Sequence, residues 1–519
     1  MEYQNIYQTL EQTALRFSEK RGVIDDREEL TYKELKERVD RAAGFLKQEL
    51  GMDRGSCLGV MMENCISYAV LIYAAAKIGA SVLLINVKLH EKEIACMLKD
   101  IRVAAVAVQE KYVKKLSAGI REGSVGILLT ETEDPCGPAG RRYSLTDIGK
   151  SHKDTEKCVE NATLPVAVLY TSGTSGVPKG VEITHRAVLE NIRSYRDILK
   201  LDEHETGLLA VPVFHITGFS CILALFVYLG ATLVMLPSFH SESTLEAIRR
   251  YRITHFHAVP TLFQMLLNYV GDASVLDSLR SAVCGGGYIE DQVMERFCKA
   301  ARHASFHPAY GMTESAGGGA LFPEHYFSLD KRGAAGQVME NCEIAIMDDQ
   351  GTILEPGATG EIAFRGPMVA DGYLHGRGGE NLRNGWLLSG DLGCMDEDRY
   401  LYIVGRKKAM INRGGEKIYS RFVEKELAAH PSVAQCAVFP VKDKLFGEVP
   451  AAVVVLKEGR QMEAAEVVGH LAERIQKNKI PQYIEFWSEL PCTASGKVKI
   501  AYLSEVFDQK YAYKKENIT

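Results

Sequence analysis

The sequence predicts an α/β protein whose larger part is built on parallel sheets with helices on their faces. An apolar strand at residues 57–61 is followed by a helical segment at 67–78 and a second strand at 81–86. A further helix–strand unit is expected at 91–108, and the polar residues 131–160 are expected to be a connection. Such alternation is typical of parallel sheets, because parallel neighbours need a crossover that is usually a helix. At 519 residues the chain is too long for one core and should form several domains.

The amino-terminal segment, residues 1–50, is predicted to be helical. Tyr7 and Leu10 begin a series of apolar residues at the three- and four-residue spacing of one helix face. Thr31 followed by Glu34 has the pattern of a helix start with a capping box.

Composition and charge are those of an ordinary globular chain. Hydrophobic residues make up 46% and charged residues 25%. The 61 basic and 67 acidic side chains give a net charge of −6, which argues against nucleic acid as the main partner. The 12 cysteines show no C-x-x-C pair or zinc-like spacing, which favours reduced thiols. No secretory signal is visible, so a cytoplasmic location is expected.

One uncharged stretch, residues 219–236, reaches the length at which a membrane span has to be considered. Gly230 divides it, and the residues after that glycine are partly β-branched and end at Pro237. This pattern favours a buried helix that turns into a buried strand. We therefore expect no integral membrane segment.

The loop at residues 170–180 is the most informative part of the chain. It separates an apolar strand from a β-branched one, and it carries four serine or threonine hydroxyls, three glycines and Lys179. Glycine lets a backbone approach a phosphate, hydroxyls add neutral donors and lysine adds charge, so the composition suits anion binding. It is not the usual P-loop, because Lys179 follows Pro178 rather than a glycine, and the plain alternative is a flexible surface turn. The loop residues expected to bind phosphate are Thr171, Ser172, Gly173, Thr174, Ser175, Gly176 and Lys179.

Four later motifs follow this loop, and the set resembles the adenylate-forming superfamily. That superfamily contains acyl-CoA and aryl-CoA synthetases, the adenylation domains of peptide synthetases, and luciferases. The motifs are Tyr-Gly-Met-Thr-Glu at 310–314, Ser-Gly-Asp at 389–391, Gly-Arg-Lys-Lys at 405–408 and Ser-Gly-Lys at 495–497. The resemblance covers nearly the whole chain.

The resemblance implies that ATP and Mg²⁺ bind to the larger domain. Tyr310 would contact adenine, Thr313 would meet phosphate, and Glu314 would hold magnesium near the phosphates. These roles suit the residue types, because magnesium prefers hard oxygen ligands and an aromatic face suits a purine. Further nucleotide contacts are expected from the backbone at Gly285, Gly286, Gly287 and Gly311.

Other site residues follow from the same resemblance. Asp391 would bind both ribose hydroxyls, and Arg406 would make a second contact to ribose and phosphate. Lys497 would bridge the carboxylate and the α-phosphate during adenylation, where one cation between two anions both positions and stabilises them. The hinge residue would be Lys408, and the glycine turn lining a pantetheine tunnel would be Gly414 and Gly415.

The resemblance also implies the domain organisation. It gives an ATP- and acyl-binding domain at 1–404, a hinge at 405–408 and a small mobile α+β lid domain at 409–519. From residue 333 the pattern turns to short strands, which would form a small β-barrel-like subdomain of the larger domain. Near the hinge, Ala409 stands where the family has an acidic residue and Ser420 where a proline is common, which affects hinge energetics rather than chemistry.

The acid is constrained by one positive and one negative feature. His215 matches a family position that lines the acyl pocket and takes part in the active site, although a structural histidine beside a helix start is the alternative. Amino-acid-activating members carry an Asp just after it, and residues 218–222 offer none, which argues against an α-amino acid. A fatty or aromatic acid is expected, with a short dicarboxylate left open. The mostly apolar pocket is expected from Phe214, Val259, Cys284 and residues 316–319.

The function implied by the resemblance is that of an acyl-CoA synthetase, an AMP-forming acid–thiol ligase. The carboxylic acid would be activated by ATP as acyl-AMP and transferred to coenzyme A. The alternatives are a stand-alone adenylation enzyme that loads the phosphopantetheine of a carrier protein, and a nucleotide-binding module without activity. The presence of Lys497, Glu314 and Asp391 argues against the last of these.

Overall fold

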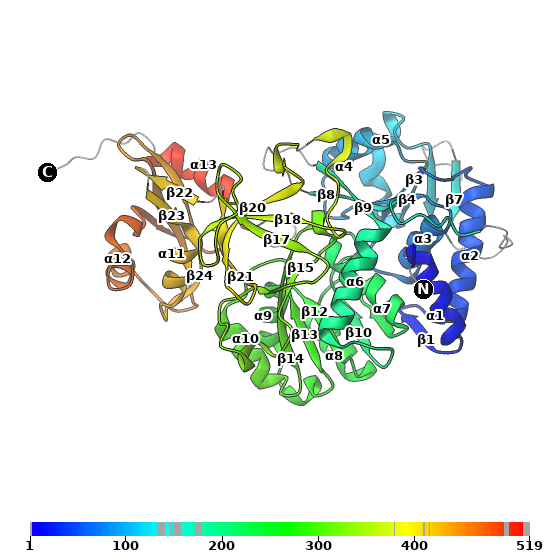
Figure 1. Cartoon of the computed structure of the whole chain (residues 1–519), viewed down its shortest axis with the longest axis horizontal. Helices are drawn as coiled ribbons and strands as arrows, with labels where there is room; N and C mark the ends of the chain where they lie inside the picture. The colour runs from blue at the N-terminus through cyan, green and yellow to red at the C-terminus, as the bar shows by residue number, and fades with distance from the viewer. Residues whose placement is uncertain are drawn as a thin grey trace. The chain divides into compact units, whose positions relative to one another are not determined.

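The computed structural model describes residues 3–131, 141–145, 148, 157–171, 179–377, 379–407, 410–414, 416–492 and 498–511. The chain divides into two compact units (Figure 1). The first contains Met1–Ile344, Phe364–Leu387 and Asp398–Tyr400, and the second contains Ala345–Ala363, Leu388–Glu397 and Leu401–Thr519.

The first unit contains a seven-stranded sheet in the order β7-β6-β5-β3-β4-β8-β9. Its strands pair in parallel except for β8 and β9, which form an antiparallel hairpin. From β3 the chain moves to β4 on one side and then crosses to β5 on the other, so the sheet has a topological switch point between β3 and β5. The strands are β3 (Cys57–Met61), β4 (Ser81–Leu84), β5 (Ala105–Val108), β6 (Ile127–Thr130), β7 (Arg141–Ser144), β8 (Pro165–Thr171) and β9 (Lys179–Thr184).

A second sheet of this unit contains the order β14-β13-β12-β10-β11-β1-β2. Strands β14 to β1 pair in parallel, and β2 closes the edge as a hairpin with β1. At the other side β15 (Gly319–Leu321) and β16 (Gly336–Val338) continue antiparallel from β14. The remaining strands are β1 (Arg21–Ile24), β2 (Glu29–Thr31), β10 (Thr206–Leu209), β11 (Thr232–Met235), β12 (His255–Ala258), β13 (Ser281–Cys284) and β14 (Ser305–Gly311).

Helices cover both sheets, as the sequence predicts. Thr31 caps the helix that follows it, with Glu34 completing the capping box. The prediction of helix throughout residues 1–50 is wrong, because β1 and β2 lie between α1 and α2 and add two strands to the second sheet. The helices are α1 (Ile6–Arg16), α2 (Tyr32–Gln48), α3 (Ile66–Lys77), α4 (Glu91–Asp100), α5 (Ser117–Arg121), α6 (His185–Leu199), α7 (Leu225–Leu229), α8 (Ser241–Tyr251), α9 (Pro260–Tyr269) and α10 (Asp291–Ala300).

The uncharged stretch 219–236 forms a buried helix followed by a buried strand, which confirms the sequence interpretation. A π-helical turn, Thr217–Ala224, continues into α7, and Gly230 ends the helix with a φ of 71° before β11 begins. Within the described ranges, no helix is long and apolar enough to cross a bilayer.

The second unit contains short strands followed by a small α/β sandwich. Its first strands pair in the open order β17-β18-β20-β21, so the described residues of the expected barrel-like subdomain form an open sheet. In the sandwich, alternate residues of β24 and β25 enter two separate cores, one under α11 and α12 and the other under α13. The elements are β17 (Glu343–Met347), β18 (Gly360–Arg365), β20 (Trp386–Met395), β21 (Tyr400–Arg406), β22 (Met410–Arg413), β23 (Glu416–Tyr419), α11 (Ser420–Ala428), β24 (Val433–Asp443), β25 (Gly447–Leu456), α12 (Ala464–Ala472), β26 (Tyr483–Phe486) and α13 (Ile500–Tyr511).

Candidate active site

The predicted phosphate loop is the turn of the β8–β9 hairpin. Thr171 and Lys179 face each other across the last rung of that hairpin. Residues 172–178, with the predicted Ser172, Gly173, Thr174, Ser175 and Gly176, lie outside the described residues. Lys179 is 9% exposed, so its ammonium group is held against the protein at the base of the loop.

Tyr373 joins the loop to the predicted magnesium ligand. Its hydroxyl donates to Glu314 Oε1 at 2.8 Å, and Lys179 Nζ lies 5.3 Å from the centroid of its ring. The backbone of Tyr373 also forms a bridge with Val181 of β9. Two residues that are far apart in the sequence, Lys179 and Glu314, therefore meet on one aromatic ring. A cation and a carboxylate so placed form a charged site suited to a metal-bound phosphate.

Glu314 lies in a short turn directly after β14. The turn, Thr313–Ser315, ends at Ala316 with a φ of 54°, and the backbone oxygen of Glu314 accepts from Ala370 N at 2.7 Å. Glu314 is 6% exposed, so its carboxylate is fixed in orientation. No group of three or more metal-binding side chains occurs in the described part of the chain. A single carboxylate fits Mg²⁺ that arrives with ATP, because such an ion takes most of its ligands from phosphate and water.

The predicted nucleobase residues lie at the carboxyl ends of β13 and β14, which are parallel neighbours. The half-buried Tyr310 is the penultimate residue of β14, and its ring centroid is 5.8 Å from that of Phe364. Gly311 has to be a glycine, since a Cβ there would lie 2.5 Å from the oxygen of Gly317. The run Gly285, Gly286 and Gly287 follows β13, and Gly286 has a φ of 74°. Carboxyl ends of neighbouring parallel strands are where ligands bind in open α/β sheets.

His215 lies between β10 and the π-helical turn. Its ring is half-buried and lies 4.9 Å from the ring of Phe214, and its backbone oxygen accepts from Phe219 N. At Gly218 a Cβ would be 2.3 Å from the oxygen of Pro212, so the chain can turn here only with glycine. π-Helical turns are rare and occur frequently at functional sites.

In the second unit, Asp391 and Arg406 face each other across β20 and β21. Arg406 Nε lies 2.7 Å from Asp391 Oδ1, and the buried Asp391 also has its backbone held by Ser389 Oγ. Gly390 N donates to Glu361, whose other oxygen accepts from Lys407 at 2.7 Å. The arrangement fixes one carboxylate and one guanidinium side by side, and a carboxylate held in this way can accept hydrogen bonds from two vicinal hydroxyls.

The remaining predicted residues of the second unit are only partly described. Gly414 has a φ of 58° and donates its N–H to Phe446 O at 2.8 Å. Its neighbour Arg413 places its guanidinium 3.9 Å from the ring centroid of Phe446. The hinge residue Lys408, together with Ala409, Gly415 and the predicted catalytic Lys497, lies outside the described residues.

Comparison with known families decides the identity of this arrangement. Residues 10–374 match the family of AMP-binding enzymes, and residues 423–497 match the AMP-binding enzyme C-terminal domain. The chain belongs to the AMP-binding enzyme family.

Relatives of this AMP-binding enzyme are similar along nearly the whole chain. It is 32% identical over 492 residues to an indoleacetate–CoA ligase of Aromatoleum aromaticum, covering 94% of this chain and 93% of that one. It is 33% identical over 491 residues to a 2-succinylbenzoate–CoA ligase of Geobacillus kaustophilus, covering 94% and 95%. The o-succinylbenzoate coenzyme A synthetase of Bacillus subtilis, solved in complex with ATP and magnesium ion, matches with a TM-score of 0.83 and 29% identity, covering 95% and 98%.

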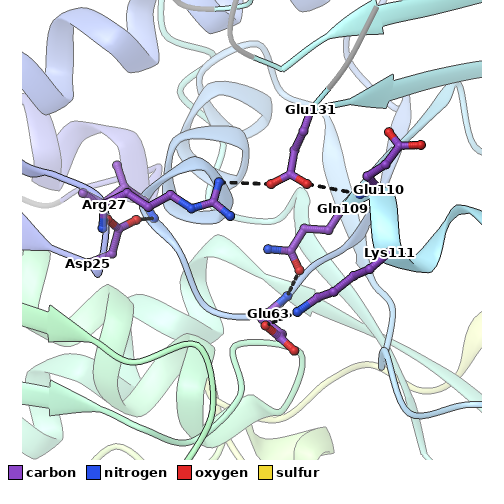
Figure 2. Close-up of polar contacts among 8 residues, drawn as sticks. Asp25, Arg27, Glu63, Gln109, Glu110, Lys111 and Glu131 are labelled. Carbon is purple, nitrogen blue, oxygen red and sulfur yellow. Dashed lines mark hydrogen bonds and ion pairs between the residues drawn. The ribbon is translucent and has the colours of Figure 1, made fainter. Parts of the chain in front are cut away.

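A second charged region of the AMP-binding enzyme lies at the carboxyl edge of the first sheet, at the β3/β5 switch point (Figure 2). This switch-point crevice has a volume of about 320 Å³. Lys111 pairs with Glu63 at 2.6 Å and Arg27 with Glu131 at 3.0 Å, while Gln109 accepts from Glu63 N. The residues that line the crevice are Asp26, Arg27, Glu63, Asn64, Cys65, Gln109, Glu110, Lys111, Glu131 and Pro237.

Sequence reasoning missed three residues that organise the site. Tyr373 lies in no stretch that the sequence singled out, whereas Glu361 and Phe364 lie in the stretch 360–366, which marks the short strands but was given no role in the site. Each of the three acts through contacts between segments that are distant in the sequence, so their roles carry no local signal. The predicted apolar acid pocket also has polar neighbours, His257 on β12 and Asn191 on α6, which the sequence analysis did not consider.

Proposed function

We propose that this AMP-binding enzyme is an aryl acid–CoA ligase that forms AMP. The observation that carries the proposal is the contact of both Lys179 and Glu314 with Tyr373, which brings charged groups of both signs together and supports binding of a magnesium-bound triphosphate. The printed names of the relatives, ligases of indoleacetate and 2-succinylbenzoate, support an aromatic acid and coenzyme A as acceptor over a carrier protein.

The reaction has two steps. In the first, a carboxylate oxygen attacks the α-phosphorus of ATP, the bond to the β-phosphate oxygen breaks, and pyrophosphate leaves. In the second, the thiolate of coenzyme A attacks the acyl carbon, and AMP leaves with the electron pair of the broken C–O bond. The first step turns a poor electrophile into a mixed anhydride, and the protein contributes positioning and neutralisation of charge.

The residue roles are part of the proposal. Lys179 neutralises phosphate charge at the base of the loop, Thr313 donates to phosphate, and Glu314 holds the magnesium ion that supplies further neutralisation. Asp391 and Arg406 bind ribose, and their existing ion pair keeps the carboxylate oriented before the nucleotide arrives. Tyr310 and the glycines 285–287 face the nucleobase, and His215 lines the acid site.

The outer parts of the scheme are also proposed. Lys497 serves the adenylation step, Lys408 is the hinge between 1–404 and 409–519, and the turn at Gly414 and Gly415 receives pantetheine. A cytoplasmic site of action fits the free thiols of the cysteines in the described ranges.

The test is pyrophosphate release from ATP and magnesium across a panel of carboxylic acids, with and without coenzyme A. A ligase gives thioester and a turnover that depends on coenzyme A. Pyrophosphate exchange without such turnover would instead favour a carrier protein as acceptor. Lys497→Ala should abolish adenylation and spare thioester formation from supplied acyl-AMP, whereas loss of both reactions would refute its restriction to the first step.

A further inference from the structure

A buried imidazole, His257, lies beneath the glycine run at the carboxyl edge of the second sheet. It is 1% exposed, and within the described residues its Nδ1 is fully buried without a hydrogen-bond partner. Its Nε2 points toward Gly285, where a Cβ would be only 3.7 Å away. A glycine at that position leaves the nitrogen uncovered at the edge where ligands bind in such sheets.

The side of β12 on which His257 lies faces the expected acid pocket. Its ring stacks on that of Tyr195 in α6, with centroids 5.8 Å apart, whereas the neighbouring Phe256 points to the opposite side and packs on Phe263 of α9. Tyr195 is hydrogen-bonded to Cys221 of the π-helical turn. The Cys221 thiol in turn lies 3.8 Å from the oxygen of Gly317, in the run expected to line that pocket.

The imidazole of His257 is uncharged and lies near polar residues that are fixed in place, which suits a neutral hydrogen-bonding partner. Burial lowers the pKa of His257 to about 3, so the ring is uncharged at neutral pH and offers one N–H donor and one acceptor nitrogen. Beside residues 316–319, which are expected to line the acid pocket, Asn191 donates to Ser220 Oγ at 2.8 Å and to Ala316 O at 3.0 Å. These two bonds hold Asn191 in place. A buried polar group without a partner destabilises the folded state. A ligand that forms the missing hydrogen bond would remove this cost and would therefore bind more tightly.

We propose that the acid activated by this enzyme carries a neutral hydrogen-bonding group, such as a hydroxyl or a ring N–H, at the end remote from its carboxylate, and that His257 binds this group. The inference rests on the proposed function and names the substrate class more narrowly. An unsubstituted hydrocarbon would leave the imidazole without a partner. A second carboxylate would find no charge on the neutral ring and would be buried at a high desolvation cost.

His255, two residues before His257 and on the same face of β12, supplies a matched control. His255 is also buried without a partner within the described residues, and burial places its pKa well below the usual value. It packs against Phe226 of α7, with ring centroids 5.4 Å apart, and no glycine uncovers it. His255→Phe therefore perturbs the same strand and the same core without touching the acid.

The experiment measures kcat/KM for pyrophosphate release by the full chain with pairs of acids matched in shape. The pairs are indoleacetate with its N-methyl derivative and para-hydroxyphenylacetate with para-methylphenylacetate. The native enzyme should prefer the hydrogen-bonding member by about tenfold or more. His257→Phe should abolish or reverse the preference, His257→Gln should retain most of it, and His255→Phe should leave it unchanged.

Equal use of both members by the native enzyme would overturn the inference, as would an undiminished preference in His257→Phe. A change confined to the KM for ATP in that variant would also overturn it, since His257 would then serve the nucleotide. If none of the acids in the panel supports pyrophosphate release, the proposed function is overturned and the inference with it. That outcome differs from equal use of both members of a pair, so the two failures are distinguishable. Thermal midpoints of the variants, measured in parallel, show whether a loss of preference reflects misfolding.

Discussion

The switch-point crevice of the first sheet and the carboxyl edge of the second sheet occupy equivalent places in their sheets but treat polar groups in opposite ways. In the crevice, Lys111 and Glu63 pair with each other, as do Arg27 and Glu131 (Figure 2). At the second edge, Nδ1 of His257 is buried without a partner in the described residues. A switch point is a place where a ligand can bind. Where the polar side chains at that place already pair with one another, however, they need no ligand as a hydrogen-bond partner.

The difference separates structural from functional roles. Asn64, which lines the crevice, donates to the oxygens of Leu209, Val211 and Leu236 and accepts from Val213 N, so it ties the end of β3 to the ends of strands in the second sheet. A residue with every bond satisfied by its own chain stabilises the fold. A residue with bonds left unmade is available to a substrate only where it is also uncovered, as His257 is beside Gly285 and His255 is not.

The largest difference in activity between the two regions is expected from substitution of Glu314. Glu314→Gln keeps the size of the side chain but removes the charge proposed to hold magnesium, so kcat/KM should fall about 100- to 1,000-fold. Glu63→Gln is the matched change in the crevice and should alter kcat/KM by less than about twofold. Pyrophosphate release at saturating magnesium measures both. A comparable loss in the two variants would erase the contrast between the regions.

The next effect concerns stability rather than activity. Asn64→Ala leaves three carbonyls and one backbone N–H without their partner, so the free energy of unfolding should fall by about 2–4 kcal/mol while the KM for ATP stays the same. Asn268→Ala, at an exposed position, should change the free energy of unfolding by less than about 0.5 kcal/mol. Denaturant unfolding measures the free energy of unfolding, and steady-state kinetics measures the KM for ATP. A native-like unfolding midpoint for Asn64→Ala would contradict the structural role.

Acid should destabilise the two regions in different pH windows. The unfolded chain protonates histidine below about pH 6.5, whereas burial lowers the pKa of His257 to about 3 and that of His307 to about 4. Between these values the unfolded state binds more protons, so stability falls as pH falls from about 6.5. His257→Phe should reduce this loss by about 1 kcal/mol between pH 6 and pH 5, as measured by denaturant unfolding at each pH.

The crevice carboxylate responds at lower pH. Burial alone would raise the pKa of Glu63, but hydrogen bonds from Lys111 and Tyr112 outweigh it and lower the pKa below its usual value. Its contribution is therefore present above about pH 4.5 and is lost only as pH falls further. An identical pH profile for the native protein and His257→Phe between pH 6 and pH 5 would show that the imidazole is not held neutral by burial.

The smallest effect is expected for Lys111→Met. The pair with Glu63 is largely exposed on the lysine side, where water screens it, so its loss should lower the free energy of unfolding by less than about 1 kcal/mol. Kinetic constants should not change. A large kinetic effect would mean that the crevice contributes to the reaction after all.

The sequence predicted most of the architecture because the alternation of strands and helices is a local signal. The capped start at Thr31 and the buried turn from α7 into β11 were predicted correctly for that reason. Strands β1 and β2 were missed because β1 pairs with β11, more than two hundred residues later, and β2 is held in the sheet only through β1. The contacts of Tyr373 and the isolation of His257 depend on several strands at once, and no local pattern encodes them.

The close contacts of the glycines in and around residues 316–319, which are expected to line the acid pocket, limit how selectivity for the acid can be altered. A Cβ at Gly311 would meet the oxygen of Gly317 at 2.5 Å, one at Gly317 would meet the Cys221 thiol at 2.7 Å, and one at Gly318 would meet Asn191 Oδ1 at 2.5 Å. A side chain at Gly311 would therefore require the backbone to move, whereas one at Gly317 or Gly318 would require Cys221 or Asn191 to move. Changes of acid specificity at these positions, whether by natural divergence or by directed evolution, would need paired substitutions, and position 257 tests whether a single side chain can change it.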